Sequence, residues 1–168
     1  TEIANEWICR CINSRPPYVG LDSETGGLYP RDGHVLGISI SYERDYGVYI
    51  NIECFDERTE ALLQTLFNQT KVIFHNAKFD IAFFEYHFNW NFPDFEDTML
   101  LHYLIDENPG THGLKQLAMK WTPYGDYEQP MYEWIKDYCK RTGTLRNQFT
   151  WDTIPFDVMS EYAAMDAV

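Results

Sequence analysis

The sequence lacks a long hydrophobic segment and has few cysteines. No apolar run in the 168 residues reaches the ~18 residues that a membrane-spanning helix needs. The amino terminus, TEIANEWICR, has no basic segment followed by an apolar core, so it is unlike a secretory signal peptide. The four cysteines include one close pair, Cys9 and Cys11, and no second pair that would complete a zinc site. We therefore expect an intracellular, cytoplasmic protein with reduced thiols and no membrane partner.

Basic residues are also scarce. The chain has 13 basic and 26 acidic residues, which gives a formal net charge of −13. This charge disfavours binding to nucleic acid through a broad basic surface. A nucleic-acid enzyme is still compatible with it, because clustered carboxylates can hold cations that then meet a phosphate. Hydrophobic residues make up 45% of the chain, and the length suits one folded domain over residues 1–168.

The order of the predicted elements favours an α/β fold with a mixed sheet. Alternating or compact apolar patterns predict strands over residues 17–22, 34–42, 46–52 and 71–76. Helical spacing predicts helices over residues 56–69, 77–88, 97–105, 114–121, 132–141 and 156–168, and residues 142–156 are irregular. An antiparallel meander followed by a parallel strand, joined through a helical crossover and flanked by helices, resembles the order of a ribonuclease H-like sheet.

Two acids follow the first predicted strand in the segment VGLDSETGGL (19–28). Asp22 and Glu24 are two residues apart, so on a strand both side chains lie on one face of the sheet. Neighbouring carboxylates repel each other unless a cation lies between them, and divalent cations prefer oxygen ligands. In the alternative interpretation the strand ends at Asp22, and both acids are solvated turn residues.

Two further acids lie on predicted helices. Asn76 and Asp80 are four residues apart at the start of an apolar helix, where Asn76 is a suitable N-cap. Tyr162 and Asp166 have the same spacing on the last helix. A carboxylate that holds a metal ion, beside a phenol that orients water, suits hydrolysis at a metal. Either acid alone is as compatible with a solvated helix face; the three patterns together, each on a suitable element, favour a metal site.

These segments resemble a known family. GLDSETGGL, VIFHNAKFD and YAAMD look like the three exonuclease motifs of the DEDD (DnaQ-like) superfamily of 3′→5′ exonucleases. In that family the domain is ribonuclease H-like, and four acids bind two divalent cations, Mg²⁺ or Mn²⁺, that cleave the terminal phosphodiester. The resemblance implies a catalytic role for Tyr162, which would orient the attacking water, and metal binding by Asp22, Glu24, Asp80 and Asp166. Glu161 stands where the histidine subclass has histidine, so the tyrosine subclass fits.

A second resemblance concerns DTMLLHYLIDENPGTHGLKQLA (97–118), which is similar to the segment after the second motif in the proofreading domains of family A DNA polymerases, phage enzymes included. It implies that Leu28 wedges against the terminal base and that Asn76 contacts the strand end. Lys78 and Phe79 fall where that family has a basic and an aromatic residue near the phosphates. We include Thr25, in the first motif, among the expected substrate-binding residues.

The sequence therefore predicts an exonuclease that removes 3′-terminal nucleotides from DNA for proofreading and releases nucleoside 5′-monophosphates. Its expected partners are a single-stranded 3′ end of DNA and a polymerase domain in cis. The chain stops two residues after Asp166, within a predicted helix, so we expect a fragment of a longer polymerase chain. A phage origin would place it in the host cytoplasm.

Two alternatives stay open. One is an RNA-trimming exonuclease of the ribonuclease D type, which would use the same acids; the polymerase-like segment 97–118 disfavours it. The other is a catalytically inactive domain that binds nucleic acid or serves as a scaffold in a polymerase. The presence of all four acids and the tyrosine disfavours this second alternative.

Overall fold

The centre of the molecule is a five-stranded mixed sheet with the strand order β3-β2-β1-β4-β5. The computed structural model describes residues 1–168. β1 pairs antiparallel with β2 and β2 antiparallel with β3, whereas β1 and β4, and β4 and β5, are parallel. The strands are β1 (Tyr18–Thr25), β2 (Val35–Glu43), β3 (Tyr46–Asn51), β4 (Lys71–Phe74) and β5 (Phe95–Asp97). The predicted α/β arrangement, an antiparallel meander extended by parallel strands, is confirmed.

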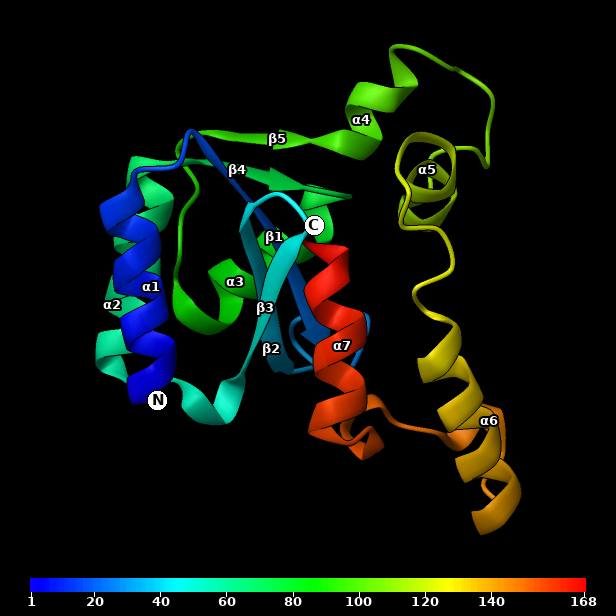
Figure 1. The fold of residues 1–168 in the computed structure, drawn as a ribbon. Helices are drawn as coiled ribbons and strands as arrows, with labels where there is room; N and C mark the ends of the chain where they lie inside the picture. The colour runs from blue at the N-terminus through cyan, green and yellow to red at the C-terminus, as the bar shows by residue number, and fades with distance from the viewer.

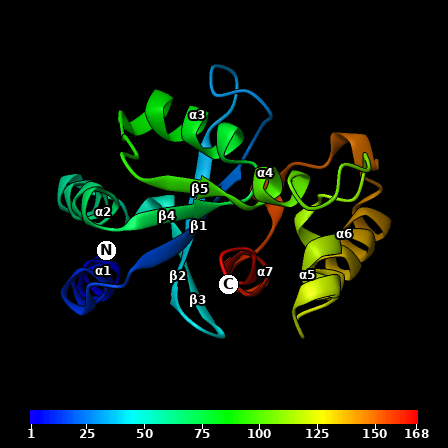
Figure 2. The ribbon, with the colours of Figure 1, turned by 90° about the horizontal axis from the view of Figure 1, so that it is seen from above.

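Helices cover both faces of this sheet (Figure 1). They are α1 (Glu2–Ser14), α2 (Glu57–Gln69), α3 (Ala77–Phe88), α4 (Thr98–Tyr103), α5 (Leu114–Trp121), α6 (Gln129–Thr142) and α7 (Phe156–Asp166). Viewed from above, α1 and α2 lie on one side of the sheet, and α7 lies on the other, between the sheet and the pair α5 and α6 (Figure 2). None of these helices combines the length and the apolar character that crossing a bilayer requires.

Two buried clusters hold these layers together. The larger one joins the sheet to α1, α2 and α3 and includes Phe67, Phe74, Phe83 and Phe84, all of which are fully buried or nearly so. The smaller one joins α6 and α7 through Met131, Ile135, Met159 and related residues. The large cluster is typical of a domain of this length, and it fixes the strand that carries the first two acids.

Three local features differ from the sequence predictions. Helix α1 was not predicted, although it buries Trp7, Ile8 and Cys11 against the main core. β5 was not predicted either, because three residues are too short for a periodic pattern. β1 continues to Thr25, beyond the predicted end at residue 22, because its last residues pair with β2. Residues 142–156 contain two short 3₁₀ turns, η2 (Arg146–Gln148) and η3 (Trp151–Thr153), within the predicted irregular segment.

The alternation of β1 decides which way its acids point. Val19, Leu21 and Ser23 are buried, and the first two belong to the main core. The residues between them project from the opposite face, on which α7 lies. Gly20 marks that face, because a Cβ atom there would collide with the backbone carbonyl of Ala167, the residue that follows α7. Asp22 and Glu24 therefore project toward α7, and the interpretation of both as solvated turn residues is wrong.

Helix α7 lies close to the sheet. It packs mainly on β3 and β2. A Cβ atom on Gly47 of β3 would collide with the carbonyl of Ala164, as one on Gly20 would with Ala167. Two glycines without side chains thus let the backbone of α7 approach the sheet and place Asp166 next to β1.

We expect Gly47→Ala to destabilise the protein by about 1–3 kcal/mol, because the added methyl group forces α7 away from the sheet. Urea unfolding measures the change. Gly113→Ala is the matched control, since its Cβ would meet no atom closer than 3.7 Å. Equal stability of the two variants would contradict the close approach of α7.

Candidate active site

A cavity of about 420 Å³ opens at the end of β1, between the loop that follows it, α3 and α7. Its ten lining residues are Asp22, Ser23, Glu24, Thr25, Gly27, Leu28, Phe79, Trp151, Tyr162 and Asp166. The fold thus brings together most of the residues that the sequence singled out. Asp80, Asn76 and Lys78 are not part of the lining.

Three carboxylates form a tight cluster in this cavity. Asp22, Glu24 and Asp166 each offer a carboxylate oxygen, and these oxygens lie within 4.8 Å of one another. Glu24 is only 7% exposed, and its Oε1 atom is buried without a hydrogen-bond partner. A buried oxygen without a partner is unfavourable unless a ligand completes it. The all-oxygen donor set fits a hard divalent cation such as Mg²⁺ or Mn²⁺.

The cluster is electrostatically strained. Burial raises the pKa of Glu24 to about 8, and the negative charge of Asp166 acts in the same direction. Burial also raises the pKa of Asp22 well above its usual value, and the charges of Asp80 and Asp166 add to the effect. The ammonium of Lys115 opposes both shifts. Because the protonated forms are favoured, a cation has to stabilise the carboxylates if they are to carry charge at neutral pH.

Asp80 lies beside this cluster without joining it. Its side chain comes from the first turn of α3 and is 2% exposed, so the interpretation that places it on a solvated helix face is wrong. Its Oδ1 atom accepts hydrogen bonds from the backbone nitrogen of Ser23 at 2.9 Å and from the Ser23 hydroxyl at 2.6 Å. Burial raises the pKa of Asp80 to about 7, although the bonds from Ser23 lower it. The charge of Asp80 in turn raises the pKa of Asp22, so the two sites are electrostatically linked.

Two residues around Asp166 were missed as site residues. The Lys115 ammonium and the Tyr127 hydroxyl both donate to Asp166 Oδ1. The ammonium also lies 4.3 Å from the centre of the Tyr127 ring and 4.7 Å from that of Tyr162. Burial, followed by the charge of Asp166, raises the pKa of Tyr162, which keeps its hydroxyl protonated. Lys115 belongs to the HGLKQLA segment that carried the second resemblance, but a single lysine in a short helix gives no signal of its own.

The start of α3 is held differently from the prediction. Asn76 has a left-handed backbone (φ 69°), and its side chain makes no capping bond. Asp97 of β5 provides the cap: its Oδ1 accepts from the Asn76 nitrogen at 3.0 Å and its Oδ2 from the Ala77 nitrogen at 2.9 Å. The exposed Asn76 side chain is left free. Lys78 lines a separate cavity, together with Ile81, Glu85 and Leu100.

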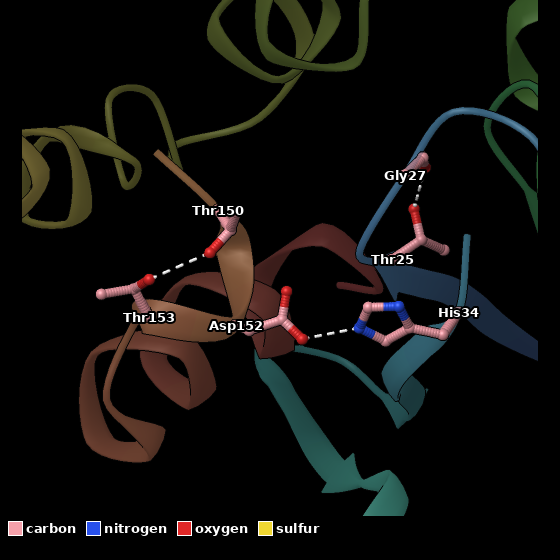
Figure 3. Close-up of polar contacts among 6 residues, drawn as sticks. All are labelled: Thr25, Gly27, His34, Thr150, Asp152 and Thr153. Atoms are coloured by element: carbon pink, nitrogen blue, oxygen red, sulfur yellow. Dashed lines mark hydrogen bonds and ion pairs between the residues drawn. The ribbon is translucent and has the colours of Figure 1, made fainter. Parts of the chain in front are cut away.

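A polar contact connects the two sides of the cavity mouth (Figure 3). His34, at the end of the loop after β1, lies 2.6 Å from Asp152 of η3 through its Nε2 atom. In the same loop the Thr25 hydroxyl donates to the carbonyl of Gly27 at 2.8 Å. The contact between His34 and Asp152 holds η3, whose residue Trp151 lines the cavity. Trp151 was missed because it lies in the segment where the sequence shows no periodic pattern.

The comparisons with known proteins agree on one family. The 3′-5′ exonuclease model of family A DNA polymerases matches residues 1–168. The chain is 44% identical over 171 residues to the DNA polymerase of Escherichia phage T5, and the match covers 97% of this chain and 20% of that protein. DNA polymerase I of Borreliella burgdorferi is 34% identical over 98 residues, which cover 54% of this chain and 11% of that protein. The chain thus spans about one fifth or less of the length of these relatives.

Several solved structures share the fold. A nuclease in its apo form superposes with a TM-score of 0.69 at 20% identity, covering 96% of this chain and 70% of that chain. NrnC of Brucella melitensis bound to pGG has a TM-score of 0.64 at 20% identity, with 90% and 67% covered. The catalytic core of RRP6 from Trypanosoma brucei has a TM-score of 0.64 at 18% identity, with 97% and 40% covered. At these identities the similarity concerns the fold alone.

The raised carboxylate pKa values predict that stability falls as pH rises. Glu24 binds its proton more tightly in the folded chain, with a pKa of about 8, than in the unfolded chain, where a glutamate pKa is ~4.3. The folded state therefore holds more protons between these two values, and the free energy of unfolding decreases across this window. In EDTA we expect the melting temperature to drop by about 5 °C between pH 6.5 and 8.5.

Burial lowers the pKa of His75, so a pH range that starts at 6.5 avoids most of the titration of this histidine. Glu24→Gln should reduce the pH dependence, with Asp22 and Asp80 accounting for what remains, whereas Glu57→Gln, at an exposed position of α2, should leave it unchanged. A melting temperature that rises over this range would contradict the raised pKa of Glu24.

Proposed function

Because the chain belongs to the 3′-5′ exonuclease family of family A DNA polymerases, we propose that it removes 3′-terminal nucleotides from DNA with the help of two divalent cations, Mg²⁺ or Mn²⁺. As a family member it is the 3′-5′ exonuclease domain of a DNA polymerase, and the family implies the use of divalent metal. The proposal adds the substrate, the number of cations and the residues that bind them. The observation that carries it is the cluster of three carboxylates with oxygens within 4.8 Å of one another.

The metal ligands in this proposal are Asp22, Glu24 and Asp166, joined by Asp80 at the edge of the cluster. The orphan Oε1 atom of Glu24 supports this assignment, because a cation would supply its missing partner. The hydrogen bonds from Ser23 orient Asp80 toward the same end of β1. Bound divalent cations supply Lewis-acid stabilisation of the phosphate charge and lower the pKa of a coordinated water. The acids would fix the position of these cations in the cavity.

Tyr162 is proposed to orient the attacking water. Its side chain lines the cavity together with Asp166, and its raised pKa keeps the hydroxyl protonated, so the hydroxyl can both donate and accept a hydrogen bond. A protonated phenol cannot act as the general base at neutral pH. Its role is therefore to fix the position of the nucleophile.

The strand end is proposed to enter between apolar side chains. Leu28 is 76% exposed at the cavity mouth, where it is free to wedge against a terminal base. Phe79 and Trp151 line the same cavity, and aromatic rings there can stack on unpaired bases. Thr25 lines the cavity and offers a polar contact, and the exposed Asn76 side chain at the start of α3 is proposed to contact the strand end. Lys78, which lines a separate cavity, keeps only a proposed long-range role toward the phosphates.

We further propose that the domain serves proofreading in a longer polymerase chain. The support is the similarity to the phage T5 DNA polymerase, of which this chain matches 20%. In that setting the polymerase region in cis would deliver a mispaired, single-stranded 3′ end to the cavity. The acidic net charge of −13 is compatible with this role, because only a few terminal nucleotides need to bind and cations neutralise the phosphate at the site.

The double substitution Asp22→Ala with Glu24→Ala should abolish Mg²⁺-dependent trimming of a 3′-labelled single-stranded DNA oligomer. We expect a loss of about a thousandfold or more, because the metal site loses two of its ligands. Denaturing gels measure the products, and circular dichroism checks that the fold is intact. The matched control is Glu57→Ala with Glu60→Ala on α2, which should trim like the parent chain.

Trimming by the Asp22→Ala, Glu24→Ala variant at the parent rate would refute the metal site. An RNA oligomer of the same sequence separates the two substrates. Preferential degradation of the RNA would favour a ribonuclease D-like activity and would contradict the DNA substrate.

Tyr162→Phe should slow trimming by about a hundredfold while Mn²⁺ affinity stays within about threefold, because the hydroxyl positions water and is not needed to bind the cation. Single-turnover kinetics and calorimetric Mn²⁺ titration give the two quantities. Tyr86→Phe, at an exposed position of α3, is the control. Unchanged single-turnover rates in Tyr162→Phe would remove the hydroxyl from the mechanism.

A further inference from the structure

The acid cluster has one basic neighbour in direct contact. The structure contains six ion-paired contacts, and only the pair between Lys115 and Asp166 includes a member of the cluster. The Asp166 side chain is 6% exposed and that of Lys115 is 27% exposed. The pair is therefore shielded from water far more than an ordinary surface ion pair, and its loss would leave a buried charge without a partner.

The surroundings of Lys115 fix its ammonium in this position. It donates to the Tyr127 hydroxyl at 2.6 Å and to Asp166, and it faces the rings of Tyr127 and Tyr162 at 4.3 and 4.7 Å from their centres. Such cation–π contacts favour a charged ammonium. Since three groups from two separate segments, Tyr127 before α6 and both Tyr162 and Asp166 on α7, hold one ammonium, its position is built into the fold.

The position of Lys115 at the start of a helix is electrostatically unfavourable, and these contacts offset that cost. Lys115 lies in the first turn of α5, which begins at Leu114 and has no acidic residue in that turn. The amino-terminal end of a helix carries a partial positive charge, so a cation there is disfavoured. A lysine at this place is therefore stabilised by what it touches on α7 rather than by its own helix.

The same oxygen of Asp166 serves both Lys115 and Tyr127. A carboxylate oxygen accepts about two hydrogen bonds, so Oδ1 is fully used by these donors. A divalent cation that binds Asp166 through this oxygen must displace one of them, and the ammonium, as a like charge, is the group that it repels.

We propose that Lys115 is a resident counterion of the carboxylate cluster, which holds Asp166 in its binding position and competes with the divalent cation for it. Lys115 is thus a positioning residue that acts through Asp166. This inference rests on the proposed metal site. The Lys115 counterion explains how the chain can fold with its acids close together before any cation binds. It also sets a concentration of free divalent cation below which the cation does not displace the lysine.

The test compares Lys115→Met with the parent chain in calorimetric Mn²⁺ titration and in thermal melting, with EDTA and with Mn²⁺. We expect the melting temperature in EDTA to fall by roughly 3–6 °C, because Asp166 loses its counterion. We expect Mn²⁺ to bind about tenfold more tightly, because its competitor is gone. The gain in melting temperature on adding Mn²⁺ should therefore be larger than in the parent chain.

Two controls separate competition from a general structural effect. Lys115→Arg keeps the charge and should stay within about threefold of the parent Mn²⁺ affinity, as should Lys120→Met, which removes a cation from the same helix away from the acids. If Lys115→Met folds only in the presence of Mn²⁺, that result supports the proposal. Lys115→Gln, which keeps a polar side chain, then supplies the affinity, and parent-like or weaker binding by it overturns the proposal.

Equal or weaker Mn²⁺ binding by Lys115→Met, or an equal loss of melting temperature with and without Mn²⁺, would overturn the competition. Failure of the parent chain itself to bind Mn²⁺ would overturn the proposed metal site, and the inference with it. Mn²⁺ binding by the parent chain with no change in Lys115→Met would overturn the inference alone.

Discussion

Asp22, Glu24 and Asp166 place carboxylate oxygens within 4.8 Å of one another, and like charges at that separation repel strongly. A folded chain keeps such repelling groups together only where its backbone prevents them from moving apart. Here the start of β1 pairs with β4, and the part that carries Asp22 and Glu24 pairs with β2, so the sheet fixes the position of these two acids. The third is held by the packing of α7 on the sheet and by the contact with Lys115.

The same constraint explains the supports around the cluster. Ser23 projects to the opposite face of β1 from its two acidic neighbours, and there it binds Asp80 through both its backbone nitrogen and its hydroxyl. Asp97 of the short strand β5 caps the start of α3 and so fixes the helix that carries Asp80. The acids of the proposed metal site are thus held by contacts with neighbouring elements: Asp80 by Ser23 and Asp166 by the side chains of Lys115 and Tyr127. Such support suits a site in which like charges lie close together.

The fold and the cavity carry different kinds of information about function. Structures about 20% identical to this chain, including a nuclease and the RRP6 core, share its ribonuclease H-like architecture, and this likeness does not choose between DNA and RNA. The family match over the whole chain and the 44% identity to a phage DNA polymerase point to the polymerase branch. The apolar residues that line the cavity, Leu28 and Trp151 among them, are where a substrate preference would be expressed.

The sequence by itself predicted the fold class, the family and the acids Asp22, Glu24 and Asp166 that the structure brings together, because these depend on local patterns: alternation in the strands, four-residue spacing in the helices and short motifs. It did not reveal β5, since a three-residue strand gives a weak local signal; α1 was overlooked although Trp7, Ile8 and Cys11 have helical spacing. Only the tertiary structure showed that Asp97 rather than the Asn76 side chain caps α3, that Trp151 lines the cavity, and that Lys115 and Tyr127 meet Asp166. These contacts join residues far apart along the chain, and their partners are set by how α5 and α7 pack beside the sheet, which no local pattern encodes.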